Sequence, residues 1–333
     1  MADAEFLVTA AGPLVTFQDV GRAGNMRYGV SASGPMDRLA FDAAHAALGN
    51  APGQTAIEIS LGGLVLRCKE GSVTVAITGG DFVVEHAGQK FSSWMILTIC
   101  KGEQLAIRAG KAGSWAYLAF AGALQSKDWL GSQATHSTSG FGGGALHSGQ
   151  SIKVGETAIR EDRLGSIREP DFIPKGPVRV VTGPQDQYFT RDALARFFSD
   201  AFKISDAYDR MGMRLNGPAL ALDGALSIPS EPIVCGSVQV SGDGVPTVLL
   251  ADHQTTGGYP KIATVISCDT DSLAQSRAGQ SVRFKSISSQ QAVSETRTFL
   301  MKKAQYLEQI SVARGSLEQR LMRENLIHGC IYD

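Results

Sequence analysis

The sequence lacks the features that would place the protein in a membrane or on a nucleic acid. No apolar run approaches the roughly 18 residues that a membrane-spanning helix needs, and the N-terminus has no basic stretch followed by an apolar one. The net charge of −1 provides no basic surface for nucleic acid or anionic lipid. We therefore expect a cytoplasmic protein with no membrane partner and no nucleic-acid partner.

Metal-binding and nucleotide-binding motifs are also missing. The 5 cysteines are widely spaced and form no Cys-x-x-Cys or Cys/His ligand pattern, which favours buried reduced thiols over disulfides or zinc. The glycines between positions 21 and 34 recur irregularly, without a phosphate loop or a dinucleotide-binding fingerprint. No Met-Lys biotinylation site and no ATP-grasp signature occurs. We predict no metal site and no covalently bound cofactor.

Glycine, in contrast, is abundant. The 38 glycines separate short runs of alternating apolar residues, above all between positions 56 and 118, and this spacing is typical of strands in a barrel or sandwich. A length of 333 residues exceeds the usual size of one domain. We predict a mainly β fold with an N-terminal β domain (1–170), a C-terminal β domain (177–288) and a helical tail (289–333). Short helices are expected after Asp37 and over 190–198.

One loop is unusually rich in hydrogen-bonding groups. It joins two apolar, strand-like runs and contains the residues Asp252, His253, Thr255, Thr256, Gly257, Gly258, Tyr259 and Lys261. The glycine pair would let backbone N–H groups approach a ligand closely. The simpler alternative is a Gly-Gly hairpin turn whose threonine hydroxyls cap their own backbone.

Two further segments pair an acid with an arginine. One contains Asp19 and Arg22, and the other contains Asp209 and Arg210. The arginines could grip an acidic group with both arms of the guanidinium, held in place by the neighbouring aspartates. The alternative is that both pairs are structural ion pairs that fasten loops.

These segments together resemble a known family. The motifs are Gln18-Asp19-x-Gly21-Arg22-x-Gly24, Ser33-Gly34-Pro35-Met36-Asp37, Asp209-Arg210-Met211-Gly212-x-Arg214, Ser230-Glu231, Gln239-Val240, the 252–263 loop and Ala274-Gln275. Over about residues 6 to 285 the chain resembles the allophanate hydrolase subunit 2 family, also called the biotin-dependent carboxyltransferase family. Its members include the C subunit of 5-oxoprolinase, the KipA regulator and part of urea carboxylase. Two segments depart from the family pattern, Ala44-His45 and Gln133-Ala134-Thr135.

The resemblance implies two cyclophilin-like β-barrel halves and pairing with a subunit 1/KipI-type protein. It implies a hetero-oligomeric, ATP-dependent amide hydrolase that opens 5-oxoproline, in which this chain corresponds to the C subunit of 5-oxoprolinase. The alternatives are the carboxyltransferase subunit of a biotin-dependent urea- or guanidine-type carboxylase and a KipA-like regulatory binding protein. ATP would be used by the assembled complex, or carboxybiotin would come from a carrier subunit. Further partners would be a small amide or lactam substrate, and a biotin carrier or a lactam-utilisation subunit.

Such chemistry requires an amide to be held, its oxygen polarised and a proton moved. We assign catalytic roles to Asp252 as an orienting or basic carboxylate and to His253 as a proton carrier. Thr255 and Thr256 would donate to a carboxylate or carbonyl oxygen, and Lys261 or Tyr259 would stabilise developing negative charge. Substrate binding is assigned to Asp19, Arg22, Ser33, Asp37, Arg210, Glu231, Gln239, Gly257, Gly258 and Tyr259. If Asp252 is catalytic, Asp252→Asn should lower turnover and leave the melting temperature unchanged.

Overall fold

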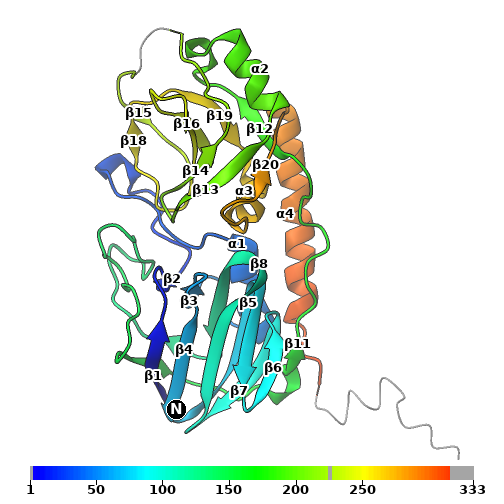
Figure 1. Cartoon of the computed structure of the whole chain (residues 1–333). Coiled ribbons are helices and arrows are strands. Elements are labelled where there is room, and N and C mark those ends of the chain that lie inside the picture. Colours follow the sequence, from blue (N-terminus) through cyan, green and yellow to red (C-terminus); the bar gives the residue numbers. More distant parts are fainter. Residues whose placement is uncertain (1–2, 224–226, 316–333) are drawn as a thin grey trace, which may run out of the picture.

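The computed structural model describes residues 3–223 and 227–315. It has two β lobes, one above the other in Figure 1, and a long helix runs along one side of both. The N-terminal lobe contains an 11-stranded sheet and the C-terminal lobe an 8-stranded sheet. The two lobes follow each other in the chain and are connected by a segment over 167–177. The predicted mainly β fold with two barrel-like halves is confirmed.

The N-terminal sheet is antiparallel throughout, and its main path runs β11-β7-β5-β8-β4-β1-β10-β9. Strands β5 and β8 are long enough to bend, and breaks in their register at Gly79–Asp81 and Asp81–Phe82 mark that bend. The strands are β1 (Ala4–Ala11), β2 (Thr16–Gln18), β3 (Ala56–Ile59), β4 (Leu64–Glu70), β5 (Ser72–His86), β6 (Gln89–Ser92), β7 (Met95–Cys100), β8 (Gln104–Phe120), β9 (Ala123–Leu124), β10 (Ser151–Gly155) and β11 (Gly165–Ser166).

The C-terminal sheet follows the order β20-β13-β14-β17-β16-β19-β12-β21. Its ladders are antiparallel except for the parallel pair β12–β21. A separate two-stranded sheet, β15–β18, lies beside it. The strands are β12 (Val178–Thr182), β13 (Phe202–Tyr208), β14 (Gly212–Asn216), β15 (Glu231–Pro232), β16 (Ser237–Val240), β17 (Pro246–Leu249), β18 (Thr256–Gly257), β19 (Lys261–Val265), β20 (Ser281–Val282) and β21 (Phe284–Ser286).

Helix α1 (Arg38–Leu48) shows how local sequence sets an element. The Asp37 side chain accepts a hydrogen bond from Ala40 N at 2.9 Å and so caps the first turn. Gly49 ends the helix in a left-handed conformation with φ of 67°. The apolar residues between these ends are buried, as predicted: Leu39, Ala40, Ala43, Ala44, Ala47 and Leu48.

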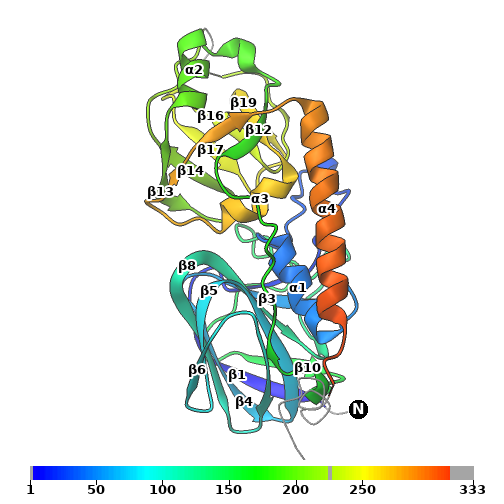
Figure 2. The ribbon, with the colours of Figure 1, turned by 90° about the vertical axis from the view of Figure 1, so that its right-hand side faces the viewer.

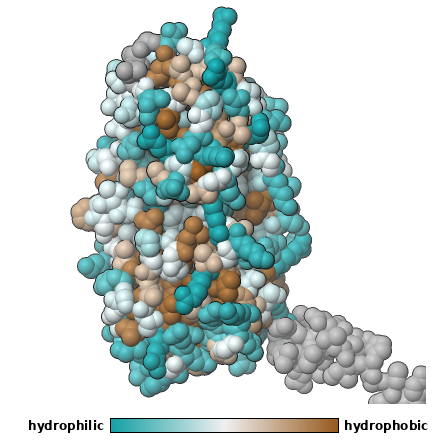
Figure 3. Space-filling view, viewed as in Figure 1, coloured by the Kyte–Doolittle hydropathy of each residue, from teal (hydrophilic) through white to brown (hydrophobic). Residues whose placement is uncertain are grey.

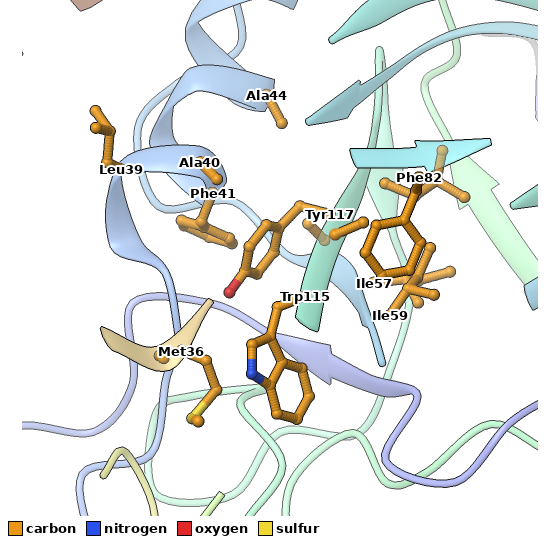
Figure 4. Close-up of a cluster of buried hydrophobic side chains, with 14 of the residues drawn as sticks. Met36, Leu39, Ala40, Phe41, Ala44, Ile57, Ile59, Phe82, Trp115 and Tyr117 are labelled. Atoms are coloured by element: carbon orange, nitrogen blue, oxygen red, sulfur yellow. The ribbon is translucent and has the colours of Figure 1, made fainter. Parts of the chain in front are cut away.

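The buried face of α1 packs on the N-terminal sheet. Phe41 meets Tyr117 of β8 edge to face, with ring centroids 5.9 Å apart, and Figure 4 shows this contact beside Trp115 and Met36. Burying aromatic side chains of this size contributes strongly to stability because each removes a large apolar area from water. The hydroxyl of Tyr117 is polar, however, and needs a partner, which the Glu58 carboxylate supplies.

Helix α4 (Ser289–Ser311) spans both lobes, as Figures 1 and 2 show. Near its start, Glu295 accepts a hydrogen bond from Arg179 of the C-terminal lobe at 2.9 Å. Near its end, Lys303 pairs with Asp42 of α1 at 2.6 Å, and Tyr306 donates to Arg168 O at 2.6 Å. The helix therefore holds the two lobes in a fixed arrangement.

The other helices agree with the sequence pattern in one case and depart from it in another. Helix α2 (Arg191–Ser199) lies where predicted, with Thr190 as its cap. Helix α3 (Ser267–Ala274) is not predicted by the sequence pattern, because its buried residues include Cys268, Asp269, Thr270 and Asp271 and so give no apolar stripe. The predicted tail is helical to Ser311, and its part beyond 315 lies outside the described residues.

The surface mixes polar and apolar side chains. Figure 3 shows small hydrophobic patches near the middle of one face, set among hydrophilic side chains. Within residues 3–223 and 227–315, no helix has the length and apolar character needed to cross a membrane.

Candidate functional site

Three polar segments stand out in the sequence, around 19–22, 209–210 and 252–261. All three lie on loops near the junction of the two lobes, and the third also reaches over one face of the C-terminal sheet. The loop after β17 begins at Leu250 and returns to the sheet at Lys261, and β18 forms its middle. Backbone hydrogen bonds fasten it to a neighbouring segment: Ile233 N donates to Thr255 O at 3.0 Å and Ile228 N to Gly258 O at 2.8 Å. Hydrogen bonds to the 228–233 segment therefore fix the loop, which is longer than a two-residue hairpin turn.

Arg210 lies at the centre of the lobe junction, with no exposed side-chain surface. Its Nε donates to Asp252 Oδ2 at 2.9 Å and its Nη2 to Asp252 Oδ1 at 3.0 Å. Nη1 donates to Glu58 of β3, and Nη2 also donates to Gly34 O at 2.6 Å. Arg210 is therefore a structural ion-pair residue that joins the two lobes.

Glu58 brings the N-terminal lobe into this network. Its Oε2 accepts hydrogen bonds from the Tyr117 hydroxyl and from Met36 N, both at 2.8 Å. The Tyr117 hydroxyl in turn accepts from Asp37 N at 2.7 Å. Burial raises the pKa of Glu58 against the attraction of Arg210, and burial together with the Glu58 charge raises the pKa of Tyr117.

The structure corrects the predicted partners of both arginines. Asp209 does not hold Arg210; its Oδ1 accepts from Met211 N at 2.8 Å and Gly212 N at 3.2 Å in an exposed turn. Asp19 accepts from Gly21 N at 2.8 Å, Ser132 Oγ at 2.6 Å and Gln133 N at 2.6 Å. Arg22 donates instead to two carbonyl groups, those of Trp129 and Ala134.

The Asp252 carboxylate is bound by protein donors on both of its oxygens. Besides the two bonds from Arg210, the Ser137 N–H donates to Oδ2 at 2.9 Å. Burial acts to raise the pKa of Asp252, but the charge and hydrogen bonds of Arg210 and the bond from Ser137 outweigh it, so the pKa is lowered. A carboxylate in this state is a weak base, which favours an architectural role for Asp252 over the predicted basic one.

Two other predicted residues of the N-terminal loops carry buried polar atoms. Arg22 is buried, its Cζ lies 4.9 Å from the Trp129 ring centroid, and its Nη1 has no hydrogen-bond partner among the described residues. Ser33 has a left-handed backbone with φ of 55°, and its hydroxyl likewise lacks a described partner. Backbone strain of this kind is common at functional loops.

The hydrogen bonds of the Asp37 side chain run to helix α1 and to Gln275, and not to the 252–261 loop. Its Oδ1 caps α1, and its Oδ2 accepts from Gln275 Nε2 of the C-terminal lobe at 2.8 Å. The Gln275 Oε1 accepts from Ser114 N at 2.8 Å, so this side chain also joins the lobes. Burial and the Asp271 charge raise the pKa of Asp37 to about 6.

A row of polar side chains crosses the outer face of the C-terminal sheet. Arg214 pairs with Thr247 across β14–β17, Thr247 with Gln239 across β17–β16, and Gln239 with Lys261 across β16–β19. Partners in register point to the same face of a sheet, so Arg214, Thr247 and Gln239 form one row, and Lys261 continues it across a β-bulge between Val238 and Gln239. The neighbours Met213, Leu215, Val238, Val240 and Val248 point to the opposite face and are fully buried.

A cavity of about 390 Å³ lies over part of this row. Arg214, Thr247 and Gln239 line it from the sheet, and Gln254 and Tyr259 line it from the polar loop. The Gln254 Nε2 donates to Gln239 Oε1 at 3.1 Å, which couples the loop to the sheet. The remaining lining residues are Ala207, Asp209, Met211, Gly212, Ser241 and Leu249.

Gly257 is required where it lies. A Cβ atom there would approach Gln239 Nε2 to 2.7 Å and Ile233 Cδ1 to 2.5 Å, so only glycine leaves the Gln239 carboxamide in its position. A Cβ atom on Gly258 would meet a backbone oxygen, Ile228 O, at 2.9 Å. The glycine pair thus permits close packing of the loop.

Lys261 occupies the end of the row, close to the β15–β18 sheet. It is buried, and its Nζ lies 3.5 Å from Glu231 Oε2, with no hydrogen-bond partner among the described residues. Gln185 donates to the same Glu231 oxygen through its side chain and accepts from Lys261 N at 2.9 Å. A buried ammonium with spare donors could hold a ligand oxygen.

The remaining loop residues have smaller roles. His253 is buried, its Nδ1 lies 2.7 Å from Gln254 O, and burial lowers its pKa. Thr255 supplies a backbone carbonyl to Ile233 N, and the Thr256 side chain is exposed on β18. Neither threonine is among the residues that line the cavity, so their catalytic assignment stays a prediction.

The contacts divide the predicted residues into two groups. Asp19, Arg22, Ser33, Asp37, Arg210 and Asp252 belong to the lobe junction, whereas Glu231, Gln239, Gly257, Gly258, Tyr259 and Lys261 belong to the outer face of the C-terminal sheet. Sequence reasoning missed Glu58, Arg214 and Gln254. Glu58 could have been found from the sequence, because it is a charged residue between Ile57 and Ile59 in an otherwise apolar strand.

Two linked β lobes with polar loops at their junction place the chain among proteins built from paired β domains. The family profile "Carboxyltransferase domain, subdomain A and B" matches residues 28–286. The chain belongs to this family. Helix α4 begins after the end of the matched region.

The relatives include an enzyme subunit, a larger enzyme and a solved structure. The chain is 33% identical to the C subunit of 5-oxoprolinase from Haemophilus influenzae over 298 residues, covering 89% of this chain and 94% of that protein. It is 28% identical to urea amidolyase of Lachancea kluyveri, covering 86% of this chain and 17% of that protein. The crystal structure of TTHA0988 superimposes with a TM-score of 0.75 at 31% identity, covering 85% of this chain. The present chain spans only 56% of that solved protein.

Proposed function

We propose that this chain is one subunit of a heteromeric, ATP-dependent amide-handling enzyme, in the role of the 5-oxoprolinase C subunit. In the assembled complex, ATP would be used to open 5-oxoproline. The observation that carries this proposal is the similarity to the C subunit of 5-oxoprolinase across 94% of that protein's length. The cavity that Gln254 and Tyr259 of the 252–261 loop line supports it, because its carboxamides and guanidinium are groups that recognise a small polar substrate.

A second candidate is the carboxyltransferase subunit of a biotin-dependent urea- or guanidine-type carboxylase. The family profile and the similarity to urea amidolyase support it. In that reaction a carrier subunit would deliver carboxybiotin, and the same cavity would hold the acceptor amide. Because the chain matches 17% of urea amidolyase, the remaining functions would come from other subunits.

We also propose where a subunit 1/KipI-type partner binds. Four large apolar side chains are exposed on the two N-terminal loops of the lobe junction: Val20 (67%), Tyr28 (68%), Leu130 (53%) and Phe141 (53%). Exposed apolar residues gathered on neighbouring loops are typical of a protein interface. The hydrogen bonds of Asp19 to Ser132 and Gln133 hold these two loops together.

The functional proposal is tested by reconstitution. The chain is combined with its subunit 1-type partner and a lactam-utilisation subunit, and ADP release is measured with and without 5-oxoproline. We expect 5-oxoproline-dependent ADP release that disappears when this chain is omitted. Carboxylation of urea, observed only after addition of a biotin carboxylase and carrier, would instead support the second candidate. The absence of both activities would contradict both proposals.

A further inference from the structure

The cavity on the C-terminal lobe presents a carboxamide pair to its interior. Gln239 is almost fully buried, and its Nε2 lies 3.4 Å from Tyr259 O while its Oε1 accepts from Gln254 Nε2. The Gln254 side chain is exposed at the cavity wall. Within the described part of the chain, Gln254 Oε1 and the second hydrogen on Gln254 Nε2 have no hydrogen-bond partner. A donor and an acceptor are therefore available on one planar group.

Such a planar edge is complementary to a particular ligand chemistry. A lactam is locked in the cis form, so its N–H and C=O lie on the same side and can pair with a carboxamide through two hydrogen bonds. A site built to bond both groups discriminates strongly against analogues that lack one of them, because a polar group is then left unpaired. The carboxamide pair thus favours a cis-amide ligand.

Arg214 adds a charge requirement at the same cavity. Its Nη2 donates to Asp243 Oδ2 at 2.9 Å, and its side chain is 47% exposed. The Asp243 carboxylate takes one donor of the Arg214 guanidinium, so other donors stay available for a ligand. A ligand carboxylate matches these donors best, because a guanidinium can bind it with two parallel hydrogen bonds. Register places Arg214 and Gln239 on the same face, separated by Thr247 alone.

We propose that this cavity recognises a small lactam acid at two points: the Gln254 carboxamide, held in place by Gln239, binds the cis-amide edge, and Arg214 binds the carboxylate. This inference rests on the proposed function and extends it by naming the residues that would select the lactam acid. A neutral urea would use the carboxamides and leave Arg214 without a role. The volume of about 390 Å³ lies within the range of roughly 300–1,000 Å³ usual for small-molecule sites.

Gly257 is a positioning residue for this recognition. Because its Cβ would lie 2.7 Å from Gln239 Nε2, Gly257→Ala must displace the carboxamide to which Gln254 is bonded. The variant changes neither group that would contact the ligand. It should weaken cis-amide binding, and it should do so without affecting the contribution of Arg214.

The test measures the binding of three probes to the full chain by nuclear magnetic resonance titration. The probes are 5-oxoproline, 2-pyrrolidone, which lacks the carboxylate, and N-methyl-2-pyrrolidone, which also lacks the N–H donor. We expect Gln254→Met to weaken binding of 5-oxoproline and 2-pyrrolidone by about tenfold or more, whereas Arg214→Met weakens 5-oxoproline alone. N-methyl-2-pyrrolidone should bind more weakly than 2-pyrrolidone. Gln290→Met and Lys285→Met, both at exposed positions, are the matched controls.

The outcomes separate this inference from the proposed function. If the reconstituted complex turns over 5-oxoproline and Gln254→Met keeps the wild-type KM, the recognition proposal is wrong and the function stands. If the complex has no such turnover but lactam binding depends on Gln254 and Arg214, the recognition proposal stands and the function is wrong. Equal affinity for the two pyrrolidones, or no binding of any probe by the full chain, would overturn the recognition proposal.

Discussion

The guanidinium of Arg210 and the carboxylate of Asp252 form a two-point ion pair with no exposed surface, and Glu58 of the other lobe completes it. Removing one partner from such a buried group leaves uncompensated charge, at a typical loss of about 3–5 kcal/mol. We therefore expect Arg210→Met to lower the free energy of unfolding by about this amount, measured by chemical denaturation.

The control for Arg210→Met is Lys101→Met, which breaks an exposed ion pair with Glu70. Pairs of that kind usually contribute about 1 kcal/mol or less, so the control should stay close to wild type. A loss for Arg210→Met no larger than the loss for the control would show that the buried network does not hold the lobes together.

The second prediction concerns Asp252 itself and revises the expectation from sequence. Because Arg210 and Ser137 already occupy the carboxylate, Asp252→Asn should reduce the stability by about 2–4 kcal/mol. Turnover per folded reconstituted complex should stay within about tenfold of wild type, since a weak base of this kind contributes little proton transfer. Melting temperature and turnover are measured on the same preparation.

Asp81→Asn is the matched control, because the Asp81 side chain is exposed on β5, lies outside the cavity lining and accepts from the backbone N–H of Lys111, which asparagine can also bind. It should change neither quantity. An unchanged melting temperature for Asp252→Asn together with a loss of turnover of about 10²-fold or more would restore the catalytic assignment.

The fold could be predicted from the sequence, whereas the contacts between the two lobes could not. Alternating apolar residues and the cap at Asp37 follow from local periodicity, so strands and α1 could be located from neighbours in the chain. The partner of Arg210 lies 152 positions away at Glu58, and no local pattern pairs them. The row from Arg214 to Lys261 likewise depends on the register of four strands, which the sequence alone leaves open.

The third prediction tests the proposed partner surface. Phe141 is 53% exposed and stacks on Trp129, with ring centroids 4.7 Å apart. Phe141→Asp would place a charge in a desolvated interface, so we expect the affinity for the subunit 1-type partner to fall by about tenfold or more. Association is measured by calorimetry with purified subunits.

Met301→Asp provides the comparison for Phe141→Asp, because Met301 is 60% exposed on α4 and lies outside the proposed surface. Its variant should bind the partner like wild type. If Met301→Asp weakens association and Phe141→Asp does not, the partner binds along α4 and the surface has been misplaced.

The last prediction is a pH dependence caused by His45. Its ring is buried against Phe41, with centroids 4.9 Å apart, and burial lowers its pKa from 6.5 to about 4 despite the nearby Asp42. Between pH 6.5 and 4 the unfolded chain therefore binds a proton that the folded chain does not, and stability is lost as the pH falls. Asp37, whose pKa is raised, acts in the opposite direction over part of this range.

Substitution isolates the contribution of His45, because Asp37 is present in every variant. In His45→Asn the contribution of the histidine vanishes, so the drop in the free energy of unfolding between pH 7 and pH 4 should be smaller than in wild type by on the order of 2–3 kcal/mol. Any cost of the smaller side chain is the same at both pH values and cancels in this difference. His147→Asn, at an exposed position, should retain the wild-type drop. Parallel pH profiles for His45→Asn and wild type would mean that His45 is not held neutral in the folded protein.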